Sequence, residues 1–143
     1  MPTSRLSCDR PHTATRVTKL AFAAWLVAAA VPATPQSVLQ FDKWMQSVDR
    51  RSQNMQRNLA RRDSAAALSD AREVRELYRL TQGYFTQRGD ATDAVKLASA
   101  GAALADDVIK SLQSNDLDMA SVSAMSIARG CRDCHVKYKP LDP

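Results

Sequence analysis

Histidine and cysteine are scarce in this chain. Its 143 residues include two histidines and three cysteines, and His135 is the only histidine that follows residue 33. A structural zinc site takes four ligands, typically Cys or His, so the two cysteines and one histidine beyond residue 33 are one ligand short. The same scarcity leaves no catalytic set of side chains in view. We therefore expect a protein that is not an enzyme.

Glycine and strand-forming runs are scarce as well. The sequence has four glycines and few long runs of β-branched residues, whereas Ala, Leu, Arg, Asp and Gln are frequent. This composition favours helix over strand. No apolar run reaches the length of about 20 residues that a membrane-spanning helix needs, so we expect no permanent membrane span. A single all-α domain is predicted, because a chain of this length buries one core without several disulfides.

The N-terminal segment differs from the rest of the chain. Four basic residues between positions 5 and 19 precede the apolar run 20–31, which is followed by Pro32 and Ala33. A basic stretch, a short apolar stretch and a small-residue site are the layout of a secretory signal peptide. We expect residues 1–33 to be this signal peptide, residues 34–143 to be the mature domain, and the location to be the periplasm.

Removal of the predicted leader changes two global properties. Cys8 leaves with it, so Cys131 and Cys134 are the cysteines of the mature chain. The leader carries four basic residues and one acidic residue, so the formal net charge falls from +5 to about +2. The mature chain then has no basic stripe with interleaved aromatic residues, and we expect no nucleic-acid partner.

Four helical segments are predicted from apolar residues that recur at intervals of three and four. They cover residues 38–59, 64 to about 84, 94–112, and a last stretch that begins at Asp116 or Asp118 and stops before Pro140. Expected N-caps are Ser37 for the first, Asp63 or Ser64 for the second and Asp90 for the third, with Gly89 ending the second. The connections are short, so the simplest assembly is an antiparallel up-down-up-down four-helix bundle.

One motif near the C-terminus carries chemistry. Cys131-Arg132-Asp133-Cys134-His135 is a C-x-x-C-H sequence, the attachment signature for c-type haem. Two thiols at this spacing can each bond a vinyl-derived carbon of one porphyrin, and the histidine next in the chain then reaches the iron. We expect one covalently bound haem c, attached at Cys131 and Cys134 and ligated by His135 on its proximal side.

Two other interpretations of the motif stay open. A thiol-redox enzyme would use Cys131 and Cys134 without haem, although a redox C-x-x-C usually opens a helix in a strand-helix fold and this motif closes a helix. A plain structural disulfide between the two cysteines is compatible with an oxidising compartment.

An exported four-helix bundle that ends in C-x-x-C-H-x-x-Y plus a basic residue resembles the cytochrome c-prime family, the class II c-type cytochromes. Cys131, Cys134, His135, Tyr138 and Lys139 match that ending. The resemblance implies haem in the bundle interior near one end, with a residue of the first helix on the distal side. Relatives with methionine there are low-spin electron carriers, and those with a non-ligating apolar residue are five-coordinate binders of NO or CO. It leaves open a homodimer through the first two helices.

Bundle geometry favours Met45 over Met55 as the distal ligand. His135 is about one turn from the end of its helix, which places the iron about 5 Å from that end at the rise of an α-helix. In an antiparallel pair Met45 lies about 12 Å from the same end and Met55 about 27 Å. We therefore predict a His135/Met45 pair and a one-electron carrier that serves a redox partner protein not identified by the sequence. A five-coordinate gas-binding haem protein is the alternative.

Overall fold

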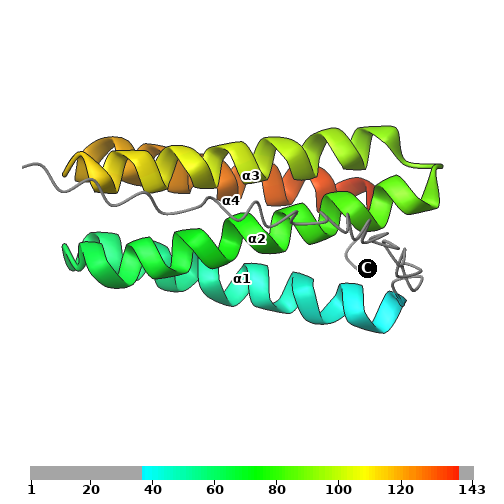
Figure 1. Cartoon of the computed structure of the whole chain (residues 1–143), viewed down its shortest axis with the longest axis horizontal. Helices are drawn as coiled ribbons and strands as arrows, with labels where there is room; N and C mark the ends of the chain where they lie inside the picture. Colours follow the sequence, from blue (N-terminus) through cyan, green and yellow to red (C-terminus); the bar gives the residue numbers. More distant parts are fainter. Residues whose placement is uncertain (1–36, 139–143) are drawn as a thin grey trace, which may run out of the picture. The chain divides into compact units, whose positions relative to one another are not determined.

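The computed structural model describes residues 37–138, and this part of the chain contains four α-helices and no strands (Figure 1). The helices are α1 (Val38–Ala60), α2 (Ser64–Arg88), α3 (Thr92–Gln113) and α4 (Leu117–Tyr138). The predicted all-α fold with four helices is thereby confirmed. The predicted signal peptide and Lys139 lie outside the described residues. Among the helices within residues 38–138, none is both long and apolar enough to cross a membrane.

Two of the predicted helix N-caps, Ser37 and Asp63, are confirmed, and Asp116, one of the two expected starts of the fourth helix, caps α4. Side-chain oxygens of Ser37, Asp63 and Asp116 accept hydrogen bonds from backbone N–H groups in the first turns of α1, α2 and α4, at 3.2, 3.0 and 3.0 Å. Each bond satisfies one of the donors that have no partner inside the helix. Local sequence therefore set where these helices begin.

The junction between α2 and α3 is predicted only in part. Gly89 ends α2 in the left-handed conformation, at φ 74°, as expected for a glycine after a helix. The expected cap at Asp90 is wrong, because the residue at the N-cap of α3 is Ala91, which makes no side-chain cap bond. Asp90 instead accepts hydrogen bonds from the Arg88 guanidinium at 3.2 and 3.1 Å. Asp90 therefore forms a charge-assisted pair with Arg88 instead of capping α3.

The core of the bundle receives one large, fully buried side chain from each helix. These are Met55, Val74, Val108 and Ile127, which belong to a single cluster. Alanines fill much of the remaining interior: Ala67, Ala71, Ala98, Ala102, Ala105, Ala120 and Ala124. Such small side chains let the helices approach closely.

Helices that are neighbours in the chain pack against each other, and α4 also packs against α1. The ring of four is therefore closed, although the α1–α4 contact is the least extensive of the four. Phe41 near the start of α1 stacks on Tyr84 near the end of α2, whereas Asn58 near the end of α1 bonds Asp70 near the start of α2. The start of α1 thus shares its end of the bundle with the end of α2.

Candidate functional site

Two hollows meet where α4 ends and α1 begins. The outer hollow has a volume of about 420 Å³ and is walled by α1, α2 and α4, with Phe41, Phe85 and Tyr138 among its lining residues. The inner hollow has a volume of about 210 Å³ and receives residues from all four helices. Met45 and His135 line both. These shared residues make the two hollows neighbouring parts of one region.

The sequence-predicted site residues come together at these hollows. Cys134 and His135 line both, and Cys131 lines the inner one. Met45, from the other side of the bundle on α1, also lines both. Met55 is completely buried in the main core cluster instead. Of the two methionines on α1, Met45 therefore shares a cavity wall with the C-x-x-C-H motif.

The two cysteines of the motif are half-buried free thiols. Their spacing of three residues places them on one side of α4. Burial raises the pKa of the Cys134 thiol, with smaller contributions from Cys131 and the Asp93 carboxylate. Reactive cysteines of redox enzymes have a lowered pKa, because the thiolate is the nucleophile. The surroundings of Cys134 shift its pKa in the opposite direction.

Tyr78 contacts the C-x-x-C-H motif, and the sequence did not predict this contact. Its hydroxyl oxygen lies 3.2 Å from Sγ of Cys131, within hydrogen-bond distance. Burial raises the pKa of Tyr78, and the neighbouring Cys131 adds to this shift. Tyr78 also packs against Gly101 of α3, since a Cβ on Gly101 would lie 2.5 Å from the tyrosine ring.

An aromatic cluster forms one wall of the outer hollow. Phe41 stacks on Tyr84 with ring centroids 4.4 Å apart and meets Phe85 edge-on at 5.4 Å. Phe85 in turn contacts the ring of Tyr138 at 5.4 Å. The rings join three helices here, because Phe41 of α1 and Tyr138 of α4 both contact Phe85 of α2. Offset and edge-to-face pairs of this kind add stability beyond their buried area.

Asp93 in the first turn of α3 is a second residue that the sequence did not reveal. Its carboxylate accepts hydrogen bonds from Nζ of Lys137 and from the hydroxyl of Tyr138. These bonds lower the pKa of Asp93 to about 2, with Lys137 as the largest cause. The last turn of α4, which follows His135, is thereby fastened to the start of α3. Only an acidic residue at a helix start was visible in the sequence.

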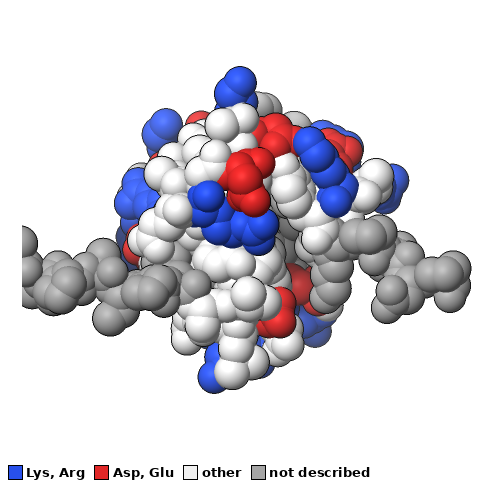
Figure 2. Space-filling view, turned by 90° about the vertical axis from the view of Figure 1, so that its right-hand side faces the viewer, with Lys and Arg blue, Asp and Glu red and all other residues white. Residues whose placement is uncertain are grey.

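Charges of both signs surround this end of the bundle. Figure 2 shows Lys and Arg side chains beside Asp and Glu side chains, with uncharged residues covering the surface between them. Arg88 pairs with Asp90 at 3.1 Å, and Lys137 pairs with Asp93. The charges near the candidate site are thus partly neutralised in pairs.

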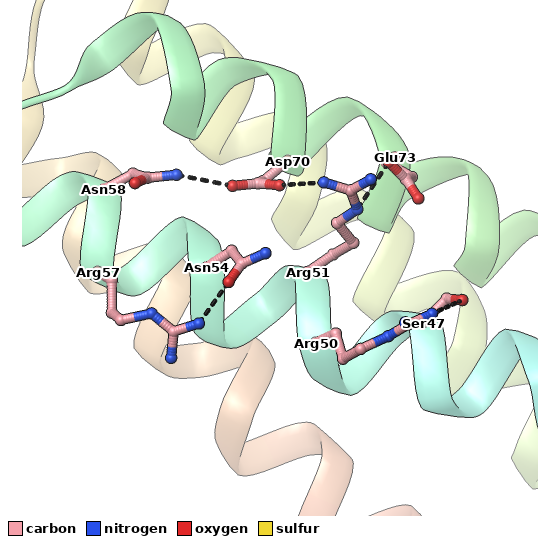
Figure 3. A network of polar contacts seen from close by, with 8 residues as sticks. All are labelled: Ser47, Arg50, Arg51, Asn54, Arg57, Asn58, Asp70 and Glu73. Atoms are coloured by element: carbon pink, nitrogen blue, oxygen red, sulfur yellow. Dashed lines mark hydrogen bonds and ion pairs between the residues drawn. The ribbon is translucent and has the colours of Figure 1, made fainter.

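A polar network joins α1 and α2 (Figure 3). The Asp70 carboxylate is buried and accepts hydrogen bonds from Arg51 at 3.0 Å and from Asn58 at 2.9 Å. Arg51 also pairs with Glu73 at 2.8 Å. Both oxygens of Asp70 are therefore satisfied by the protein itself, as expected of a buried carboxylate with a structural role.

Within residues 37–138, no three Asp, Glu, Cys or His side chains are gathered as a metal-binding group. The ligands that the hollows do present are of a different kind: two thiols, one imidazole and one thioether. Comparison with protein-family models, with curated proteins and with solved structures found no match to this chain.

Proposed function

We propose that the chain is an exported mono-haem c-type cytochrome that carries single electrons. The observation behind this proposal is the gathering of Met45, Cys131, Cys134 and His135 on the walls of adjoining hollows. Two thiols suit covalent attachment, and an imidazole with a thioether suits the two axial positions of the iron. The walls of the inner hollow are mainly apolar, and the outer hollow, at about 420 Å³, falls within the range of about 300–1,000 Å³ that is typical of cofactor sites.

Haem bound here would exchange one electron between its ferric and ferrous states. In this proposal Cys131 and Cys134 hold the group, His135 is the proximal ligand and Met45 the distal ligand. The remaining residues shape the surroundings, since burial and axial ligation set the reduction potential. The aromatic cluster of Phe41, Tyr84, Phe85 and Tyr138 shields one side of the outer hollow from water.

An antiparallel bundle with haem near one end is part of the same proposal. The pairing of Phe41 with Tyr84 and of Asn58 with Asp70 supports an antiparallel α1–α2 pair, because higher positions on one helix meet lower positions on the other. The bonds from Lys137 to Asp93 support the same order for α3 and α4, since the end of one meets the start of the other.

A gas-binding protein with five-coordinate iron is the second candidate. The outer hollow favours it, because about 420 Å³ of space lies beside both His135 and Met45. A small diatomic molecule would occupy that space if Met45 did not ligate the iron. A thiol-redox enzyme is less well supported, since burial raises the pKa of Cys134.

Mass spectrometry after acid-acetone extraction tests the proposal. Extraction removes non-covalent haem, so the retained mass should equal the mature polypeptide plus one haem. The chain in which both Cys131 and Cys134 are replaced by alanine is the control, and its mass should equal the polypeptide alone. A wild-type mass that matches the processed polypeptide without haem would exclude a c-type cytochrome.

A further inference from the structure

We propose that Tyr78 is a positioning residue for Cys131. Its hydroxyl holds the Cys131 sulfur at the wall of the inner hollow, while Cys134 has no such restraint. The role of Tyr78 in haem attachment rests on the proposed function. The restraint on the Cys131 thiol is a property of the chain before any haem is bound.

The tyrosine ring packs closely against α3. Tyr78 belongs to α2 and is 9% exposed. On the α3 side it fills the space that a side chain at position 101 would occupy, since a Cβ on Gly101 would lie 2.5–2.7 Å from three ring carbons. Glycine in a helix interior costs about 1 kcal/mol relative to alanine. The close packing of the Tyr78 ring against Gly101 offsets this cost.

The Tyr78 hydroxyl contacts the sulfur of Cys131 and not that of Cys134. The oxygen of Tyr78 and Sγ of Cys131 are 3.2 Å apart, and both residues line the inner hollow. A thiol can donate or accept in this contact, but a thioether sulfur can only accept. Burial raises the pKa of Tyr78, so the phenol keeps its proton and remains a donor to either form of sulfur.

Cys134 differs from Cys131 in this respect. Within residues 37–138 the one hydrogen bond to a cysteine sulfur is that of Cys131. Cys134 is half-buried and lines both hollows, and its neighbours raise its pKa without fixing its rotamer by a hydrogen bond. The two thiols of one motif are therefore restrained to different degrees.

Restraint of Cys131 matters for attachment because thioether formation depends on orientation. The thiol adds across a vinyl double bond of haem: an S–C bond forms at one carbon, the thiol hydrogen goes to the other carbon, and the C=C π bond is lost. No oxidant or reductant is consumed. A sulfur that is already held at the cavity wall loses less freedom when it reacts. Tyr78 thereby favours attachment at Cys131 without touching the iron ligands.

Thiol labelling of the haem-free full chain tests the restraint. Iodoacetamide alkylates each thiol with loss of iodide, and peptide mapping gives separate rates for Cys131 and Cys134. In the wild type Cys131 should react more slowly than Cys134. Tyr78→Phe removes only the hydroxyl and should raise the Cys131 rate about two- to tenfold, the value of one ordinary hydrogen bond, without changing the Cys134 rate.

Tyr84→Phe is the matched control, because Tyr84 is buried on the same helix but its ring stacks on Phe41. It should change neither rate. Gly101→Ala is a second variant that keeps the hydroxyl and displaces the ring, and it should also accelerate Cys131 selectively. An unchanged Cys131 rate in both Tyr78→Phe and Gly101→Ala, or an equal rise for both cysteines, would overturn the restraint.

Haem-loaded protein supplies the second measurement. After denaturation, labelling reports any thiol that escaped attachment, and Tyr78→Phe should show more label at Cys131 than the wild type, with no increase at Cys134. Equal labelling of Cys131 in the two proteins would overturn the role in attachment. If the chain holds no haem while the labelling rates of the haem-free chain change as expected, the proposed function fails and the restraint by Tyr78 stands.

Discussion

The α1–α2 contact and the wall of the inner hollow treat their buried polar groups differently. At the α1–α2 contact, the buried Asp70 carboxylate has protein partners for both oxygens. On the wall of the inner hollow, the hydroxyl of Ser52, the residue after Arg51, is buried without a hydrogen-bond partner in the described part of the chain. Buried polar groups are normally satisfied, so this wall offers a hydroxyl that a bound group can satisfy.

The two methionines of α1 show the same contrast in packing. Met55 is fully buried among core side chains, whereas Met45 is half-buried at the hollows. A buried thioether that fills a close-packed core contributes to folding. Met45 packs against the edge of the core cluster and also borders both hollows, so its thioether is accessible from them.

The largest effect that would separate the two regions is expected from these methionines. In the haem-free chain, Met55→Ala should lower the free energy of unfolding by about 2–5 kcal/mol, because it leaves a cavity in the core. Met45→Ala should lower it by less than about 1 kcal/mol, since that side chain already borders empty space. Urea denaturation of both variants measures the difference. Equal losses would show that the two methionines are packed alike.

A smaller effect is expected from the buried polar groups. Asp70→Ala deprives Asn58 and Arg51 of a shared acceptor and should lower the free energy of unfolding by about 1–3 kcal/mol. The lower part of this range is expected, because the Arg51 side chain is 41% exposed and can turn to water.

Ser52→Ala is the counterpart on the wall of the inner hollow. It removes a hydroxyl that has no partner in the described structure, so the free energy of unfolding of the haem-free chain should stay within about 0.5 kcal/mol of the wild type or rise. The same denaturation series measures both variants. A loss from Ser52→Ala as large as that from Asp70→Ala would contradict the contrast between satisfied and orphaned groups.

The smallest effect concerns the bonds from α4 to Asp93. The pKa of Asp93 is lowered to about 2 in the folded chain, chiefly by Lys137. Because the folded pKa lies below the value of about 3.9 for an unfolded aspartate, the stabilisation is fully present above pH 4 and is lost as the pH falls towards 2.

Asp93→Asn should therefore lower Tm at pH 7, and its difference from the wild type should shrink between pH 4 and pH 2. Asp90→Asn is the control, because Asp90 pairs with Arg88 only two residues away and that pair needs no tertiary structure. It should change Tm less than Asp93→Asn at pH 7. A difference for Asp93→Asn that is the same at pH 2 and pH 7 would show that the carboxylate charge is not responsible.

Helix positions were predictable because the signals are local. Ser37, Asp63 and Asp116 cap their helices through bonds that reach only three residues along the chain. The error at Asp90 has the same local origin, because two kinds of donor compete for one carboxylate: Asp90 accepts from the Arg88 guanidinium rather than from a backbone N–H at the start of α3. Sequence pattern does not rank two such bonds.

The candidate site was predictable only as far as spacing determines it. The C-x-x-C-H motif is contiguous, and helical rise alone placed Met45 nearer to it than Met55. The partners of the motif are distant in sequence: Tyr78 contacts Cys131 across 53 residues, and Lys137 reaches Asp93 across 44. The close packing of Tyr78 against Gly101 likewise depends on how the helices pack, which spacing along the chain does not determine.

The absorption spectrum of the purified holoprotein tests the central claim, a haem held by the motif with Met45 as its distal ligand. At neutral pH the wild type should show low-spin bands in both oxidation states. Met45→Leu should convert both to high spin and allow CO to bind, while Met55→Leu, the matched change in the core, should leave the spectrum unchanged. A wild type that is already high-spin and binds CO, or one without a Soret band, would contradict the account.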